Sequence, residues 1–346
     1  MEHRVEVRPL DWLAPDGEAS WKTWRRVAAC YHVAMAAEVR IGTSGYHFKD
    51  WVGTIYPKGL PSREFLPYYA RMFDCVEINT SFYRVPEASL FEGMLKKVPD
   101  GFLYVVKTPK EITHDRALFE EVVEPFLAGI EPLHSAGRLS CLLAQFPYAF
   151  KPDSASVSHL EKLAANLLGA GIPVNVEFRH DGWYREEMFS MLRDMGLGFV
   201  NVDLPRLARL PGPSNIATSP IAYYRLHGRN AEMWWKHPTP SHRYDYSYDD
   251  MEITAWTNRI EEMRPNVDMV FAFTNNCRMG ASVMDALRMK QLLNLDDLVS
   301  DAEVPGGLFK TEAEDPLEAM RRRIDLAREA DRPAIERWRA EQANQA

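Results

Sequence analysis

Charged and polar side chains recur where short apolar segments end, and one such segment shows what chemistry the pattern allows. Residues 174–179 alternate apolar with polar side chains, which predicts a short strand. Asn175, Glu177 and Arg179 would then share one face of that strand. A carboxylate and a guanidinium on a buried face are costly unless they are paired or functional. We expect an active-site role rather than a structural ion pair, so Glu177→Gln should keep the fold and lose activity.

Polar residues at the ends of other apolar segments complete one candidate site. The groups that can transfer protons or hold charge are assigned catalytic roles: Glu77, Lys107, Glu177, Asp203 and His227. Aromatic, amide and guanidinium side chains are assigned to substrate binding: Tyr46, Trp51, Asn79, Tyr83, Gln145, Arg179, Arg225, Arg229, Asn275 and Asn276. Because guanidinium groups match phosphate or carboxylate oxygens, the set predicts an anionic small molecule or a nucleic-acid fragment as the partner.

A divalent metal ion is one expectation for the centre of this site. Glu177, Asp203 and His227 end three successive apolar segments, an order similar to the metal sites of xylose-isomerase-like and endonuclease-IV-like barrels. Asn275 stands where a fourth carboxylate would be expected, and nearby arginines would compete with a metal for Glu177. An anion site without metal is therefore the other expectation.

Three functions remain open from these residues. The leading hypothesis is a hydrolase acting on a phosphoester, in a nucleotide or nucleic acid, with Glu177 or Asp203 as base and His227 as acid. Aromatic residues such as Tyr46 and Tyr83 would stack a base or a sugar. The second hypothesis is a sugar isomerase or epimerase with two carboxylates that move a proton. The third is a binding protein that holds a phosphorylated ligand or a nucleic-acid strand without catalysis, and a site filled by arginine–carboxylate pairs would favour it.

Eight apolar segments are the expected strands that position these side chains: 39–42, 75–79, 102–108, 139–146, 174–179, 199–203, 221–227 and 269–276. Helical periodicity lies between most of them, as at 63–73, 154–168, 185–195, 249–263 and 281–293. This alternation predicts an α/β fold, a single (β/α)8 TIM-type barrel with its chemistry where the strands end. An open doubly wound sheet is disfavoured because no Gly-x-Gly-x-x-Gly follows the first strand.

Composition bounds the organisation of the chain. Its 346 residues, 46% of them hydrophobic, suit one barrel (38–300) with an N-terminal extension (1–37) and a charged tail (301–346). Helical stretches are expected at 316–328 and 333–342 of the tail. A net charge of −8 argues against nucleic-acid binding through bulk charge. The four cysteines lack metal-ligand spacing and no apolar run is long enough to cross a membrane, so we expect a cytoplasmic protein.

Several motifs in one order also resemble a known family. They include Ile41-Gly-Thr-Ser-Gly-Tyr46, Val76-Glu-Ile-Asn-Thr-Ser-Phe-Tyr83, Gln145-Phe-Pro147, Val176-Glu-Phe-Arg-His180 and Tyr224-Arg-Leu-His-Gly-Arg229. With these motifs the chain resembles the DUF72 (YecE-like) family over residues 39–295. The resemblance implies a TIM-type barrel of bacterial cytosolic origin. It implies no particular reaction, so the function has to be argued from the site.

Overall fold

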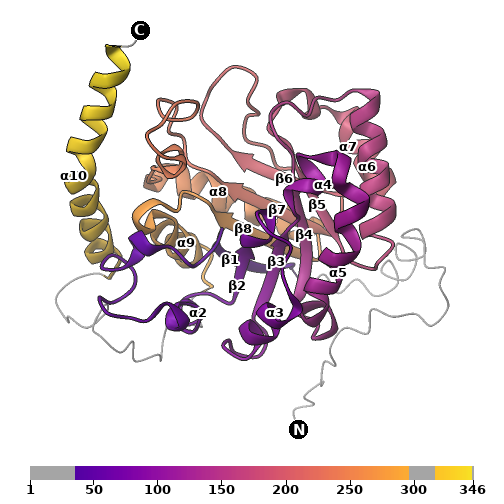
Figure 1. The fold of residues 1–346 in the computed structure, drawn as a ribbon, viewed down its shortest axis with the longest axis horizontal. Coiled ribbons are helices and arrows are strands. Elements are labelled where there is room, and N and C mark those ends of the chain that lie inside the picture. The colour runs from indigo at the N-terminus through magenta and orange to yellow at the C-terminus, as the bar shows by residue number, and fades with distance from the viewer. Residues whose placement is uncertain (1–35, 296–315, 345–346) are drawn as a thin grey trace. The chain divides into compact units, whose positions relative to one another are not determined.

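Eight parallel strands form a nearly closed barrel, which confirms the predicted (β/α)8 fold (Figure 1). The structure is a computed structural model, and it describes residues 36–295 and 316–344. The strands are β1 (Glu38–Thr43), β2 (Cys75–Ile78), β3 (Leu103–Lys107), β4 (Leu139–Gln145), β5 (Val174–Glu177), β6 (Gly198–Asp203), β7 (Ile221–Leu226) and β8 (Met269–Thr274). Each of them overlaps a segment predicted from its apolar residues.

The barrel closes between its first and last strands. β1 pairs with β8 over six residues, from Glu38 opposite Met269 to Thr43 opposite Thr274. On the other side of β1, an isolated parallel bridge between Ser44 and Glu77 links it to β2. Because parallel strands all end on the same side, the polar residues that end them meet at one mouth of the barrel.

Helices surround the barrel (Figure 1). They are α2 (Phe65–Tyr69), α3 (Ala88–Leu95), α4 (Lys110–Thr113), α5 (Phe119–Ser135), α6 (Ser154–Leu167), α7 (Glu186–Met195), α8 (Asp250–Met263), α9 (Ala281–Leu292) and α10 (Pro316–Ala343). Local signals set several of their ends: Asp249 and Glu252 form a capping box at the start of α8, and Gly196 ends α7 in the left-handed conformation with φ 74°. The helix expected at 63–73 is shorter: Ser62–Glu64 forms a 3₁₀ turn ahead of it, and α2 ends at Tyr69.

Two apolar clusters follow from the alternation of side chains along the strands. Val174 and Val176 of β5 belong to the larger cluster, which also holds buried residues of the surrounding helices. A smaller cluster contains Val105, Leu143 and Phe271, which alternate with residues of the larger cluster and therefore fill the barrel interior. Glu177 lies on the interior face as the strand pattern predicted, because its neighbours in sequence belong to the outer cluster.

The C-terminal tail contains one long helix rather than the two stretches expected from its sequence. α10 runs from Pro316 to Ala343 and continues through Pro333. The described residues from Ala37 onward group as one compact unit. The extension 1–35 and the boundary expected at residue 300 lie outside the described residues. In the part of the chain that the structure describes, no helix is long and apolar enough to cross a membrane.

Candidate functional site

Arg225, near the end of β7, lies between two buried glutamates. Its Nε and Nη2 donate to the two carboxylate oxygens of Glu77 over 2.8 and 2.7 Å, and its Nη1 donates to Glu177 Oε2 over 2.5 Å. None of the three side chains is more than 2% exposed. Charge-assisted hydrogen bonds of this geometry fix the guanidinium plane, so the two glutamates determine where Arg225 points.

The other oxygen of Glu177 faces two further groups. Arg179 Nε donates to Oε1 over 2.5 Å, and His227 Nε2 lies 3.3 Å from the same oxygen. On the far side of the ring, His227 Nδ1 is 2.7 Å from Asn275 Nδ2. An amide nitrogen can only donate, so Nδ1 accepts and the imidazole proton is assigned to Nε2, where it faces Glu177.

These contacts set the charge states of the cluster. Burial by itself raises the pKa of Glu177, but the guanidinium groups of Arg179 and Arg225 outweigh it and hold that pKa well below its usual range. Burial and the positive charge of Arg179 lower the pKa of His227 to about 3, so the imidazole is neutral at physiological pH. Glu177 is therefore ionised and lies beside two guanidinium groups and one neutral imidazole.

Lys107 ends β3 beside this cluster. Its Nζ donates to Gln145 Oε1 over 2.8 Å and lies 4.0 Å from the centre of the Phe82 ring. Burial and the nearby charge of Arg225 lower the pKa of Lys107 to about 7. A pKa in this range suits a group that transfers a proton near neutral pH.

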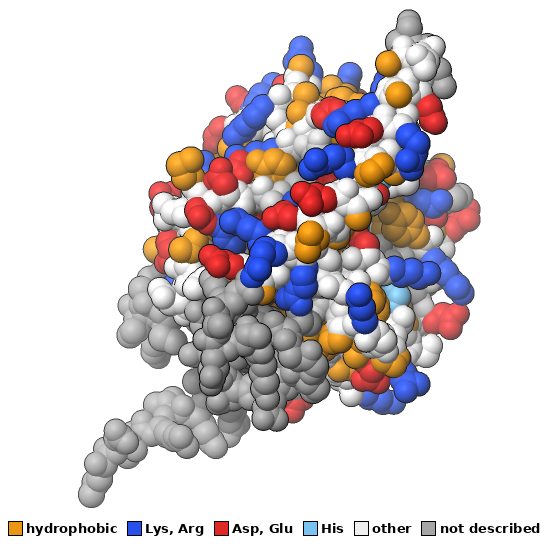
Figure 2. Space-filling model, turned by 90° about the vertical axis from the view of Figure 1, so that its left-hand side faces the viewer, with side chains coloured by type: hydrophobic (Ala, Val, Ile, Leu, Met, Phe, Trp, Pro, Cys, Tyr) orange, Lys and Arg blue, Asp and Glu red, His pale blue; other side chains and the backbone are white. Residues whose placement is uncertain are grey.

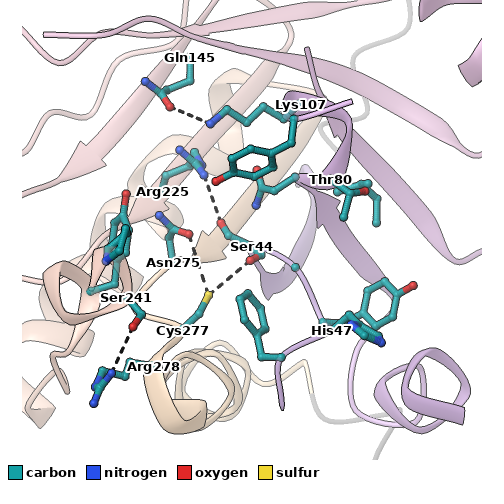
Figure 3. A pocket seen from close by; sticks show the side chains of 18 of the residues that line it. Ser44, His47, Thr80, Lys107, Gln145, Arg225, Ser241, Asn275, Cys277 and Arg278 are labelled. Atoms are coloured by element: carbon teal, nitrogen blue, oxygen red, sulfur yellow. Dashed lines mark hydrogen bonds between the residues drawn. The ribbon is translucent and has the colours of Figure 1, made fainter. Parts of the chain in front are cut away.

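A cavity of about 720 Å³ opens over the mouth of the barrel (Figure 3). Lys107, Arg179 and Arg225 line its inner part, and aromatic rings contribute other walls: Tyr46, Phe48, Tyr83 and Tyr244. Arg278 and Ser241 lie at the opposite end from Lys107 and Gln145 (Figure 3). This volume is within the range of small-molecule sites, roughly 300–1,000 Å³.

Comparison with known proteins shows the family of this chain. A family model described as "Protein of unknown function DUF72" matches residues 40–307. The chain belongs to this DUF72 family. The curated relative YunF of Bacillus subtilis is 27% identical over 274 residues, which cover 75% of this chain and 95% of YunF. YecE of Escherichia coli is 35% identical over 116 residues, 33% of this chain and 39% of YecE. A solved DUF72 family protein from Thermotoga maritima is 38% identical with a TM-score of 0.69, covering 74% of this chain and 99% of that protein.

The DUF72 barrel brings many of the candidate site residues together. Eight of them line the cavity: Tyr46, Asn79, Tyr83, Lys107, Gln145, Arg179, Arg225 and Asn275. Glu77, Glu177 and His227 are fully buried and contact the lining residues from behind. The predicted convergence at one mouth therefore holds for these eleven side chains, but the carboxylates face arginines rather than the cavity.

Four other candidate residues have separate surroundings. Asp203 accepts from Arg229 Nε over 2.8 Å, and Arg229 also pairs with Glu252 of α8. Asn276 is buried and donates to Asp285 Oδ2 over 2.7 Å. Trp51, expected to contact substrate, is 0% exposed and donates from Nε1 to the carbonyl of Cys277 over 2.6 Å. None of these four side chains lines the cavity, although Trp51 supports it from behind through its hydrogen bond to Cys277.

The metal expectation does not fit the donor set. Within the described ranges, no group of three or more His, Cys, Asp or Glu side chains is arranged to hold a metal ion. Arg179 and Arg225 use the oxygens of Glu177, while Arg229 binds Asp203. A metal ion would have to displace these guanidinium groups, because they already use the carboxylate lone pairs.

Sequence reasoning missed several residues of the site. Tyr223 donates to Glu77 Oε2 over 2.5 Å, and Ser44 Oγ lies 3.4 Å from Arg225 Nη2. Cys277 and Arg278 line the cavity after β8. Tyr223 is two residues before Arg225 on the interior face, so the same alternation could have identified it. Arg278 follows a loop, where strand periodicity carries no information.

Proposed function

We propose that the barrel mouth binds a small organic anion, such as a phosphorylated or carboxylated ligand. The observation that carries this proposal is the convergence of Lys107, Arg179 and Arg225 on the inner part of one cavity. The two buried carboxylates, Glu77 and Glu177, offset only two of these three positive charges when Lys107 is protonated. One charge is left in excess, and an incoming anion would neutralise it.

Both glutamates act in this proposal by holding the guanidinium groups in place. Arg225 has contacts to Glu77 and Glu177, so its fork is oriented before a ligand arrives. An oriented group loses less conformational freedom on binding, which strengthens binding without adding a contact. The arrangement favours anion recognition over isomerisation, since a sugar isomerase needs its carboxylates against the substrate.

Aromatic side chains in the cavity suit a ring attached to the anion. Tyr46, Phe48, Tyr83 and Tyr244 line it, and Tyr83 is 77% exposed. Aromatic rings stack on nucleobases and sugars with little dependence on which base is present. A nucleoside monophosphate or a sugar phosphate therefore fits the chemistry of both parts of the cavity.

Hydrolysis of a phosphoester is the finer proposal, and Lys107 is the observation that favours an enzyme. Its amine lines the cavity with a pKa near 7, whereas Glu177 and His227 are fully buried behind the arginines. In such a reaction Arg179 and Arg225 would stabilise the phosphoryl charge and Lys107 would transfer a proton.

Ligand titration of Lys107→Met tests the binding proposal. Uridine 5′-monophosphate and sulfate should bind to the wild type, and uridine should bind much more weakly than its monophosphate. The variant should lose at least about tenfold in affinity for both anions, because a charge-assisted hydrogen bond disappears. Lys96→Met, at an exposed position after α3, is the matched control and should leave both affinities unchanged. Equal binding of uridine and its monophosphate would refute the proposal.

Turnover is tested separately with the same variants. Phosphomonoester and phosphodiester substrates are screened with and without Mg²⁺, Mn²⁺ or Zn²⁺. Release of phosphate from a monoester, or cleavage of a diester to a monoester and an alcohol, by the wild type and Lys96→Met, together with loss of this activity in Lys107→Met, would support hydrolysis. Tight anion binding without any turnover would leave a binding protein as the function.

A further inference from the structure

Ser241 and Arg278 form the outer wall of the cavity, at the end opposite Lys107. The C-terminal helix α10 contacts this wall through Arg278. This side chain lines the cavity, is 8% exposed and donates from Nη1 to Ser241 Oγ over 3.2 Å. Its Nη2 donates to Asp331 of α10, and its Nε lies 3.3 Å from Asp245 Oδ2. One guanidinium thus joins the helix to two residues of the 240–247 segment.

A second arginine makes the link from the helix side. Arg328 of α10 donates from Nε to Asp245 Oδ1 and from Nη1 to Ser247 Oγ, both over 2.7 Å. Asp331 also lies 3.4 Å from His242 Nε2. Asp245 therefore accepts a hydrogen bond from Arg328 of α10 and also faces Arg278 of the cavity wall. The two arginines and two aspartates form a four-charge network in which every arginine meets an aspartate.

Apolar packing keeps α10 against the barrel, so this network does not depend on a freely moving helix. Met320 and Ile324 are 0% and 1% exposed and belong to the main apolar cluster. Charged side chains of both signs are interspersed on the face shown in Figure 2. The helix at Pro316–Ala343 also lies beyond residues 40–307, which the DUF72 family model matches. It is an element added to the matched family region.

We propose that α10 holds the outer wall of the cavity in its ligand-binding position, with Arg328 and Asp331 as positioning residues. They act through Arg278 and the 240–247 segment and need not touch a ligand. The role in ligand binding rests on the proposed function of the cavity, whereas the positioning itself does not. Arg278, which joins the network to the cavity, is 8% exposed, and a guanidinium held by several hydrogen bonds has a fixed orientation.

The reactivity of Cys277 reports on this wall without any ligand. Cys277 precedes Arg278, lines the cavity and is 7% exposed. Burial raises the pKa of its thiol to about 12, so alkylation of the native protein is slow. Cys75 and Cys141 are fully buried in the barrel and report on opening of the barrel itself. The rate at which N-ethylmaleimide modifies each cysteine is measured by peptide mass spectrometry in the full-length chain.

Asp331→Asn and Arg328→Met should each raise the alkylation rate of Cys277 by at least about threefold, with no change at Cys75 or Cys141. Arg339→Met is the matched control, because Arg339 lies on the same helix and pairs with Glu232 over 2.7 Å, away from the cavity wall. Its Cys277 rate should equal that of the wild type. An unchanged Cys277 rate in Asp331→Asn, or a parallel rise at Cys75, Cys141 and Cys277, would overturn the proposal.

Ligand binding extends the same test. Uridine 5′-monophosphate is long enough to approach the outer wall, whereas sulfate needs only the inner cations. Asp331→Asn should therefore lower the affinity for the nucleotide by about fivefold and leave the affinity for sulfate unchanged. Equal loss for both anions would contradict a role confined to the outer wall. Failure of the wild type to bind either anion would refute the proposed function instead, and the alkylation rates would still decide the role of α10.

Discussion

Arg225 binds both carboxylate oxygens of Glu77, with Nε 2.8 Å from Oε2 and Nη2 2.7 Å from Oε1. The two residues belong to β7 and β2, which are not neighbours in the sheet, so this pair crosses the barrel interior. A planar guanidinium that binds a carboxylate at two points cannot rotate without losing both contacts. The pair therefore fixes the inner part of the cavity at the same place where it holds two strands together.

Replacing either glutamate should destabilise the barrel. Glu77→Gln or Glu177→Gln leaves Arg225, which is only 2% exposed, with an incompletely compensated charge, which costs about 3–5 kcal/mol. The free energy of unfolding, measured with urea, checks this value. Glu87→Gln, which breaks an exposed pair with Arg84, is the control and should leave stability unchanged within error. A Glu177→Gln protein of full stability that had lost turnover would return Glu177 to the catalytic role expected from the sequence.

The sequence was sufficient to predict the interior direction of several charged side chains, although not of Asp203, whose neighbours Val202 and Leu204 belong to the interior cluster. Glu177 and Arg179 alternate with apolar residues, and the period of two along a strand decides their direction whatever their partners are. The same rule placed Lys107 and Arg225 at the mouth. Their convergence then follows from the parallel barrel, because all eight strands end on one side.

The sequence did not predict which carboxylate each arginine pairs with. Arg225 had three carboxylates within the predicted site, and nothing in the spacing shows that it binds Glu77 and Glu177 while Asp203 binds Arg229. Such pairing depends on side-chain conformations and on the radius of the barrel. The contacts of α10 are equally hidden, since a surface helix with charges of both signs gives no signal of where it packs.

Anion binding should depend on pH through Lys107. Its pKa of about 7 in the folded protein means that the positive charge is present below pH 7 and is lost above it. Sulfate affinity should therefore fall by about tenfold as the pH rises from about 6 to about 8.5, when a charge-assisted hydrogen bond is lost. Sulfate is used because its own charge is constant in this range. Isothermal titration calorimetry at several pH values measures the change.

The same lysine affects stability in the opposite sense. Its folded-state pKa lies below the usual 10.5, so between about pH 7 and 10.5 the unfolded chain binds the proton that the folded protein lacks. The cost of burying the charge is complete below pH 7 and is relieved as the pH rises through this window. Lys107→Met should remove both pH dependences. A sulfate affinity with the same pH profile in wild type and variant would assign the titration to another group.

His227 should contribute to acid sensitivity. Its pKa of about 3 in the folded protein lies below the usual 6.5, so the unfolded chain binds an extra proton between these values. Stability from this group is complete above about pH 6.5 and falls by up to about 1.4 kcal/mol for each pH unit below it. Urea unfolding at several acidic pH values should show a smaller loss in His227→Gln. His134→Gln, exposed at the end of α5, should follow the wild type, and an unchanged slope in His227→Gln would contradict the assignment.

Trp51 and Tyr83, given the same substrate-binding role by the sequence, should respond differently to substitution. Trp51 is 0% exposed and its ring nitrogen donates to the carbonyl of Cys277, so Trp51→Phe leaves a buried acceptor unsatisfied and costs about 1–3 kcal/mol. Tyr83 lines the cavity and is 77% exposed, so Tyr83→Ala should change stability by less than about 0.5 kcal/mol. If Tyr83 stacks on a base, its removal should lower the affinity for uridine 5′-monophosphate by roughly tenfold and leave the affinity for sulfate unchanged. Thermal unfolding and calorimetric titration of both variants separate the two roles. Equal loss of nucleotide and sulfate in Tyr83→Ala would show that this ring shapes the anion site rather than binding a base.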